Sequence, residues 1–297
     1  MNLYEHCTLC PRACGVNRTR GERGFCGADD RLKVARAALH FWEEPCLSGK
    51  RGSGTVFFSH CNLRCCYCQN REISSGGFGK EISTERLAKI FLSLQAQGAH
   101  NINLVTPTQY YPHIIQALRL AKKQGLSLPI VCNSGGYECV KTLKELDGLI
   151  DIYLPDFKYY DERYALRYSA APHYMEIAAA TVEEMLRQTG TPQFDGEGMM
   201  QKGVIVRHLA LPGLSDDSKR VVKFLDRTFG NRIIMSLMSQ YTPPKDIAFP
   251  ELSSPLARDD YDDLVEYAQL IGVENAYVQE EGCAEESFIP PFDLTGV

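Results

Sequence analysis

The stretch GTVFFSHCNLRCCYCQN, residues 54–70, joins an apolar β-branched run to a loop rich in cysteine. The run at 55–59 predicts a buried strand, and the loop carries Cys61, Cys65 and Cys68, separated by three and then two residues. A structural zinc site normally has four protein ligands, and no fourth Cys or His follows here at a usable spacing. Three thiolates can instead hold a [4Fe–4S] cluster with one iron left open. The sequence therefore predicts an iron–sulfur site directly after the first strand.

From residue 54 onward, short apolar runs alternate with helical patterns. Leu87, Ile90, Phe91 and Leu94 form one apolar helical stripe that Gly98 can end. Helices are likewise expected between further strands, including one long helical stretch that closes at Gly190, and the segments 74–80 and 191–202 are expected to be mobile loops. The further strands are predicted at 102–106, 129–133, 149–154, 203–209, 233–238 and 276–279. Six or seven such units predict the α/β class and a partial (β/α)6-type, TIM-like barrel.

Polar side chains follow the predicted strands at their carboxyl ends. In a barrel of β-α units these ends meet on one rim, where active sites lie. Asp156 and Lys158 follow the strand at 149–154, which favours a functional role over a simple turn cap and a solvated lysine. Arg207 and His208 are adjacent on a strand, so they point to opposite faces and at most one enters the barrel. We expect Arg207 to be the one inside.

Composition and charge limit the class of protein. The chain has 297 residues, of which 44% are hydrophobic and 23% charged, a mix typical of globular proteins. A net charge of −5 without a basic face argues against nucleic-acid binding. No apolar run approaches a membrane span and the start MNLYEHCTLC lacks the pattern of a signal peptide, so we expect a cytoplasmic protein without a membrane partner. Twelve cysteines in that reducing compartment favour metal binding.

A second cysteine group precedes the barrel. HCTLCPRACGVNRTRGERGFCG places Cys7, Cys10, Cys14 and Cys26 in a short glycine-rich segment. Four thiolates predict either a closed zinc site or a second iron–sulfur cluster that relays electrons, and both alternatives remain open. We expect a cysteine-rich metal-binding lobe at 1–50 and the partial barrel at 51–297. Four isolated cysteines are expected to be small buried residues: Cys46, Cys132, Cys139 and Cys283.

Further motifs accompany the cysteine loop along most of the chain. NINLVTPTQYYP, NSGGY, DIYLPDFKYYD, RHLALPG and SLMSQYTP follow it in order. Together with CNLRCCYCQNR, this set resembles the radical S-adenosylmethionine (SAM) superfamily, and within it a branch similar to pyruvate formate-lyase activating enzyme. The resemblance implies a [4Fe–4S] cluster and SAM as cofactors, and reductive cleavage of SAM to a 5′-deoxyadenosyl radical.

The resemblance also implies roles for individual residues. Cys61, Cys65 and Cys68 would hold the cluster, and Asp156 and Lys158 match a D-x-K motif that faces cofactor and substrate. The positions expected to contact SAM are Tyr67, Asn70, Thr106, Thr108, Asn133, Ser134, Gly135, Arg207 and Gln240, with Tyr241 on the adenine side. The sequence departs from the family at two places: Thr106-Pro107-Thr108 replaces the Gly-Gly-Glu segment that commonly holds the amino group of SAM, and Asn133 replaces the usual aspartate.

Three classes of function are compatible with these patterns. The first is an anaerobic radical SAM oxidoreductase that takes hydrogen from a protein glycine, as glycyl-radical activating enzymes do, or from a peptide or small molecule, with a donor such as flavodoxin or ferredoxin. The second is a non-catalytic binding module stapled by zinc, which the incomplete ligand set of the cysteine loop disfavours. The third is an iron–sulfur electron carrier, which seldom needs a barrel of this size. The enzyme hypothesis accounts best for the loop.

Overall fold

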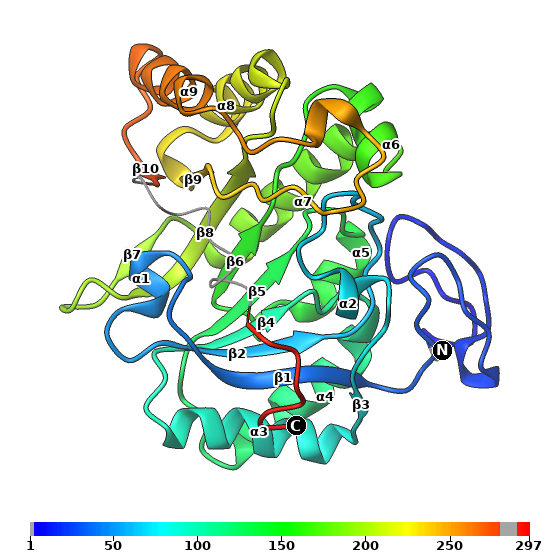
Figure 1. Ribbon diagram of the computed structural model, residues 1–297. Coiled ribbons are helices and arrows are strands. Elements are labelled where there is room, and N and C mark those ends of the chain that lie inside the picture. The colour runs from blue at the N-terminus through cyan, green and yellow to red at the C-terminus, as the bar shows by residue number, and fades with distance from the viewer. Residues whose placement is uncertain (1–2, 280–289) are drawn as a thin grey trace.

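A computed structural model describes residues 3–279 and 290–297. Its centre is a ten-stranded sheet in the order β10-β9-β8-β6-β5-β4-β2-β1-β3, with β7 paired to β8 (Figure 1). The strands from β10 to β2 along this order are parallel, as buried apolar runs predict. They are β2 (Ser53–Phe58), β4 (Ile102–Val105), β5 (Ile130–Ser134), β6 (Ile152–Pro155), β8 (Met200–Leu209), β9 (Ile234–Met238) and β10 (Ala276–Val278). The predicted α/β partial barrel is therefore confirmed.

Helices cover the outer face of the sheet (Figure 1). In α3 the side chain of Ser83 accepts a hydrogen bond from the backbone N–H of Arg86 at the N-cap, and the predicted stripe of Leu87, Ile90, Phe91 and Leu94 is buried. The longer helices are α3 (Thr84–Ala96), α4 (Tyr111–Lys123), α6 (Glu162–Ser169), α7 (Tyr174–Thr189), α8 (Ser215–Phe229) and α9 (Arg258–Leu270). Shorter ones are α1 (Pro45–Ser48), α2 (Arg71–Ser74), α5 (Val140–Leu143) and the 3₁₀ turns Arg18–Arg20, Thr108–Tyr110, Lys144–Leu146, Gly230–Arg232 and Pro250–Leu252.

Three local expectations differ from the structure. The single helical stretch before Gly190 is two helices, because Ala170 and His173 take left-handed φ values of 48° and 55° and break the helix between α6 and α7. The segment 191–202 contains β7 (Gln193–Phe194), which forms an antiparallel pair with β8. The segment 74–80 ends in β3 (Lys80–Glu81), which pairs with β1 (Lys33–His40).

Strand β1 forms the antiparallel border of the sheet. It pairs with β2 over most of its length, and the segment 290–297 lies against its other side in front of β1 and β2 (Figure 1). We call this segment the carboxyl-terminal strap. Its backbone bonds join Leu294 N–H to the carbonyl of Ala35 (3.1 Å) and Ala37 N–H to that of Thr295 (2.8 Å). The strap therefore covers part of an exposed strand edge.

The apolar core has an outer and an inner part. The outer part fills the space between sheet and helices and includes Cys132, which is fully buried as expected. The inner part lies on the concave side of the sheet and joins Cys46 and Leu47 of α1 to side chains of β5, β6, β8 and β9. Cys139 is half-buried, and Cys283 lies outside the described residues. Helix α1 thus closes the amino-terminal end of the barrel.

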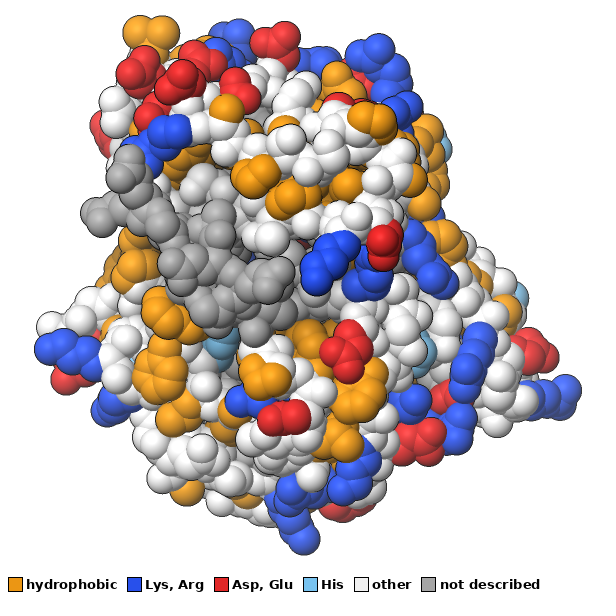
Figure 2. Space-filling view, viewed as in Figure 1, with side chains coloured by type: hydrophobic (Ala, Val, Ile, Leu, Met, Phe, Trp, Pro, Cys, Tyr) orange, Lys and Arg blue, Asp and Glu red, His pale blue; other side chains and the backbone are white. Residues whose placement is uncertain are grey.

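Some large hydrophobic side chains remain on the surface, and patches of them are visible in Figure 2. The aromatic ones just after β1 are Phe41, 49% exposed, and Trp42, 60% exposed. Among the residues that the structure describes, no helix has the length and apolar character needed to cross a membrane.

Candidate functional site

The three cysteines of the first group lie on the loop between β2 and α2, at the carboxyl end of the strands. Burial raises the pKa of the Cys61 thiol, and the nearby thiols of Cys65 and Cys68 raise it further. Each sulfur has a polar partner, namely Leu63 N–H for Cys61 (3.4 Å), Ser169 Oγ for Cys65 (3.0 Å) and Ser74 Oγ for Cys68 (3.2 Å). Three neighbouring sulfurs with polar partners are a suitable ligand set for a cluster, whose potential depends on such hydrogen bonds.

Within residues 3–279 and 290–297, no group of three or more His, Cys, Asp or Glu is gathered so as to hold a single metal ion. A cube of four irons differs from a single ion because each cysteine binds a different iron. The donor set at Cys61, Cys65 and Cys68 therefore fits a [4Fe–4S] cluster better than a single ion.

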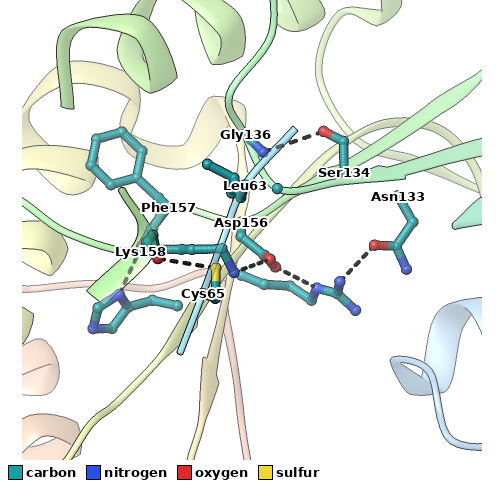
Figure 3. Close-up of polar contacts among 12 residues, drawn as sticks. Leu63, Cys65, Asn133, Ser134, Gly136, Asp156, Phe157 and Lys158 are labelled. Atoms are coloured by element: carbon teal, nitrogen blue, oxygen red, sulfur yellow. Dashed lines mark hydrogen bonds and ion pairs between the residues drawn. The ribbon is translucent and has the colours of Figure 1, made fainter. Parts of the chain in front are cut away.

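Asp156 and Lys158 follow β6 and lie beside Cys65 (Figure 3). The Nζ of Lys158 is 2.6 Å from Oδ2 of Asp156, and their side chains are only 14% and 22% exposed. Burial alone would raise the pKa of Asp156, but the charges of Lys158 and Arg207 hold it below its usual value. Burial opposes the charge of Lys158 as well, yet Asp156 and Cys65 keep its pKa raised. The pair is therefore ionised in the folded protein.

Arg207 extends this ion pair along the inside of the barrel. Its Nε is 3.2 Å from Oδ1 of Asp156, and one Nη donates to Oδ1 of Asn133 on β5 at 2.6 Å. His208 points to the other side of the sheet, where it is buried and Nδ1 lies 2.8 Å from the carbonyl oxygen of Phe157. The prediction that Arg207 and His208 point to opposite faces of the sheet is confirmed, with Arg207 inside the barrel.

The end of β5 brings Asn133, Ser134 and Gly135 next to the cysteine loop. The Oγ of Ser134 accepts from the N–H of Gly136 at 3.4 Å. A Cβ at Gly135 would lie 2.7 Å from Cδ1 of Leu63, so glycine lets the cysteine loop approach this strand. The three predicted cofactor-binding residues on β5 thus lie together beside Asp156 and Lys158.

The segment after β4 contains the next two predicted cofactor residues. Thr106 has a left-handed φ of 57°, and its N–H donates to the carbonyl of Asn133 at 2.8 Å. Thr108 is buried, and its hydroxyl donates to Oε1 of Glu138 at 2.7 Å. Burial raises the pKa of Glu138 to about 7 against the hydrogen bonds of Thr108 and Tyr111. The sequence pattern gave no sign of this buried carboxylate.

The remaining predicted residues lie beyond the cysteine loop. Tyr67 is buried, contacts Tyr241 edge-on at 6.2 Å between ring centroids, and shares a 2.7 Å hydrogen bond with the hydroxyl of Tyr159. Gln240 is tied to the same loop because its carbonyl accepts from Nε2 of Gln69 at 3.0 Å. Asn70 is the N-cap residue of α2, without a side-chain capping bond. These contacts place Tyr67, Gln240 and Tyr241 on one side of the site.

The four cysteines of the second group lie in one segment at the start of the chain. Cys7 and Val16 are joined by a backbone hydrogen bond of 3.0 Å, and Cys10 accepts from the N–H of Ala13 in a turn between them. Burial raises the pKa of Cys26, and the thiols of Cys7 and Cys14 add to this effect. The role of the four thiols as ligands of zinc or of a second cluster stays a prediction.

Arg12 connects the two cysteine groups. Its guanidinium stacks 3.6 Å from the ring centroid of Phe25, and its Nε donates to the carbonyl of Asn62 at 3.0 Å. Burial lowers the pKa of Arg12, while the thiols of Cys10, Cys14 and Cys61 oppose that shift. One half-buried cation therefore lies between both sets of thiols, which the sequence did not predict.

Comparisons with known proteins agree with this geometry. Residues 55–225 match the radical SAM superfamily. The chain is 29% identical to the uncharacterised protein MJ0674 of Methanocaldococcus jannaschii, over 93% of this chain and 78% of that one. It is 31% identical to a pyruvate formate-lyase-activating enzyme of Clostridium pasteurianum over 36% of this chain and 46% of that one.

A similar fold occurs in SuiB of Streptococcus suis. The structure of SuiB bound to SAM has a TM-score of 0.53 and 11% identity, and covers 75% of this chain and 49% of that one. A second SuiB structure, bound to the precursor peptide SuiA, has a TM-score of 0.52 and 12% identity, with 75% and 47% covered. The present chain therefore spans about half the length of SuiB.

Proposed function

The chain belongs to the radical SAM superfamily, and from this premise we propose that it reductively cleaves SAM at a [4Fe–4S] cluster held by Cys61, Cys65 and Cys68. The observation that carries the proposal is the position of the three thiols beside the ion pair of Asp156 and Lys158 at the carboxyl ends of the strands. A [4Fe–4S] cluster held by these three cysteines would supply, when reduced, the one electron needed to break the C5′–S bond of SAM into methionine and a 5′-deoxyadenosyl radical, which would take a hydrogen atom from substrate carbon.

The residues around the cluster loop position the reactants. Lys158 and Arg207 are buried cations that suit the carboxylate of the methionyl group, and Asp156 holds both in place. The end of β5 is proposed to contribute Asn133, Ser134 and the following Gly135, of which Asn133 turns its side chain to Arg207. The remaining proposed SAM contacts come from Tyr67, Asn70, Thr106, Thr108, Gln240 and Tyr241. Such enclosure by barrel walls excludes water and stray hydrogen donors from a reactive radical.

The proposal includes three classes of substrate: a protein glycine, a peptide and a small molecule. The partial likeness to a pyruvate formate-lyase-activating enzyme supports a protein glycine as the hydrogen donor. The structural likeness to a protein solved with a precursor peptide supports a peptide, and a small molecule fits the same chemistry. A flavodoxin or ferredoxin would supply the electron, and the cytoplasm, where thiols stay reduced, is the proposed setting.

The amino-terminal lobe is proposed to hold a second metal centre through Cys7, Cys10, Cys14 and Cys26. The position of Arg12 between these thiols and Cys61 favours a second [4Fe–4S] cluster that relays electrons, with structural zinc as the alternative. Iron and zinc analysis after anaerobic reconstitution separates the two, since two clusters give about eight irons per chain and one cluster with zinc gives about four.

The test of the proposed function is the formation of 5′-deoxyadenosine from SAM by the reconstituted protein with a strong reductant. Cys65→Ala should abolish it. Cys66→Ala is the matched control, because Cys66 is the adjacent cysteine outside the ligand set and should retain activity and iron. A wild-type protein that contains only zinc and forms no 5′-deoxyadenosine would instead support the zinc-stapled binding module.

A further inference from the structure

Two adjacent carboxylates, Glu43 and Glu44, lie inside the closed end of the barrel. They immediately precede α1, which is anchored by an inner apolar cluster and by a 2.8 Å hydrogen bond from Nδ2 of Asn101 to the carbonyl of Leu47. Neither residue was predicted from the sequence, where they appear as two acids in the linker before Pro45.

Glu43 bridges the concave side of the sheet. Its Oε1 accepts from Nδ2 of Asn103 on β4 at 2.9 Å, and its Oε2 lies 3.3 Å from an Nη of Arg207 on β8. Strands β5 and β6 separate β4 from β8 in the sheet, so a side chain that contacts both must lie within the curve of the barrel. The Glu43 side chain is only 8% exposed.

Glu44 lies next to it, beside β9. Burial and the neighbouring charge of Glu43 raise the pKa of Glu44, whereas the charge of Arg207 and the hydroxyl of Ser236 favour the ionised form. Ser236 is paired in register with Arg207, which places it on the same inner wall. Glu44 is 8% exposed, and its Oε2 has no hydrogen-bond partner among the described residues. A buried carboxylate oxygen without a donor is costly unless a ligand supplies one.

Carboxyl groups outnumber cations inside the barrel. Asp156, Glu43 and Glu44 are three carboxyl groups, against two cations from Lys158 and Arg207, and burial raises the pKa of both glutamates. Lys158 is bound to Asp156, and Arg207 is shared between Asp156 and Glu43.

Oδ1 of Asn103, on β4, is a further buried acceptor without a partner among the described residues. A hydrogen-bond donor would satisfy Oε2 of Glu44, and a donor with a positive charge would also favour the ionised form of Glu44 against its burial.

We propose that the closed end of the barrel binds a cationic nitrogen of the substrate, an ammonium or guanidinium group, with Glu44 as its ionic partner and Glu43 as the positioning residue for Arg207. The inference rests on the proposed function, because Asp156 joins this network to the cysteine loop. The substrate would extend from the cluster end of the barrel to Glu44. A free amine and a lysine or arginine side chain of a peptide share this chemistry.

The experiment measures binding of n-butylamine, n-butylguanidine and neutral 1-butanol to the reconstituted protein with SAM, by the shift of the thermal unfolding midpoint with ligand concentration. The wild type should bind one of the two cations and not the alcohol. Glu44→Gln should weaken that binding by about tenfold or more, since a charge-assisted hydrogen bond is lost. Glu44→Asp, which keeps the charge, should restore part of it. The matched control is Glu183→Gln, on the exposed side of α7.

Two further readouts separate the proposal from a structural role and from the proposed function. Without ligand, Glu44→Gln should unfold at the wild-type temperature or above it, because a buried carboxyl group with an unpartnered oxygen is replaced by a neutral amide. A lower midpoint would indicate a structural role of Glu44 and overturn the proposal. Wild-type 5′-deoxyadenosine formation by Glu44→Gln would show that the cluster end is intact. If neither the wild type nor Glu44→Gln forms 5′-deoxyadenosine, the proposed function fails. If the wild type binds no cation, or if Glu44→Gln binds it as tightly as the wild type, this inference alone is overturned.

Binding of two tripeptides distinguishes a peptide side chain from a free amine as the source of the cation. Tighter binding of Gly-Lys-Gly than of n-butylamine, with no binding of Gly-Leu-Gly, would assign the site to a peptide side chain. Binding of the free amine alone would assign it to a small molecule, and either result supports the cationic site.

Discussion

Substitution of Gly136 by alanine should damage the site more than its single methyl group suggests. Gly136 lies in the turn after β5 with a φ of +72°, and a Cβ there would overlap the carbonyl oxygen of Asp156 and lie 3.2 Å from the hydroxyl of Tyr174. Alanine in this conformation costs about 1–2 kcal/mol. The overlap adds about 1–3 kcal/mol more, because two buried backbone segments must separate. We therefore expect a loss of unfolding free energy of about 3 kcal/mol.

Gly148 provides the matched control. Its φ is +74°, yet no atom lies within 4 Å of a Cβ built there, so Gly148→Ala carries the conformational cost alone, about 1 kcal/mol. Urea denaturation of both variants measures the difference. Gly136→Ala should also slow 5′-deoxyadenosine formation, since Asp156 must move away from Lys158 and Arg207. Equal unfolding free energies for the two variants would refute the assignment of the steric overlap.

Three other outcomes follow from separate contacts. Ser169→Ala removes the hydrogen bond to Sγ of Cys65, so the cluster potential should become more negative in a redox titration; an unchanged potential would contradict the contact. Burial raises the pKa of Glu138 from 4.5 to about 7, so ionisation of this carboxyl group lowers the free energy of unfolding as pH rises through this range. Glu138→Gln should therefore lose less of that free energy than the wild type between about pH 5 and pH 8 in urea titrations. A Cβ at Gly24 would lie 2.6 Å from Sγ of Cys14, so Gly24→Ala should lose the amino-terminal metal while about four irons remain, and retention of both metals would count against the proposed ligand set.

The parallel part of the barrel could be predicted because its signals are local. A strand buried on both faces needs an unbroken apolar run, as β6 shows with IYLP, and a covering helix needs a stripe such as that of α3. Strand alternation predicted that Arg207 and His208 face opposite sides, and the suitability of a guanidinium for a carboxylate favoured Arg207 as the inner one. The position of Asp156 and Lys158 just after a strand placed them on the rim.

The parts that escaped prediction depend on distant contacts. Strand β1 has the sequence KVARAALH, which carries little β-propensity and is held in place by its pairing with β2. Helix α1 has four residues, too few to show a period. Because α1 was missed, nothing in the sequence indicated that Glu43 and Glu44 enter the barrel. Their burial depends on side chains from three strands far along the chain.

The carboxyl-terminal strap has a consequence for synthesis of the protein. Arg36 and Asp293 form a 2.7 Å ion pair although 257 positions separate them, and the backbone bonds of Ala35 and Ala37 reach equally far. A ribosome adds residues in order, so β1 emerges early, and the outer backbone groups of Ala35 and Ala37 have no partner until residues 290–297 follow. During translation this border is open to pairing with another nascent chain, and chaperone protection is needed most in that interval.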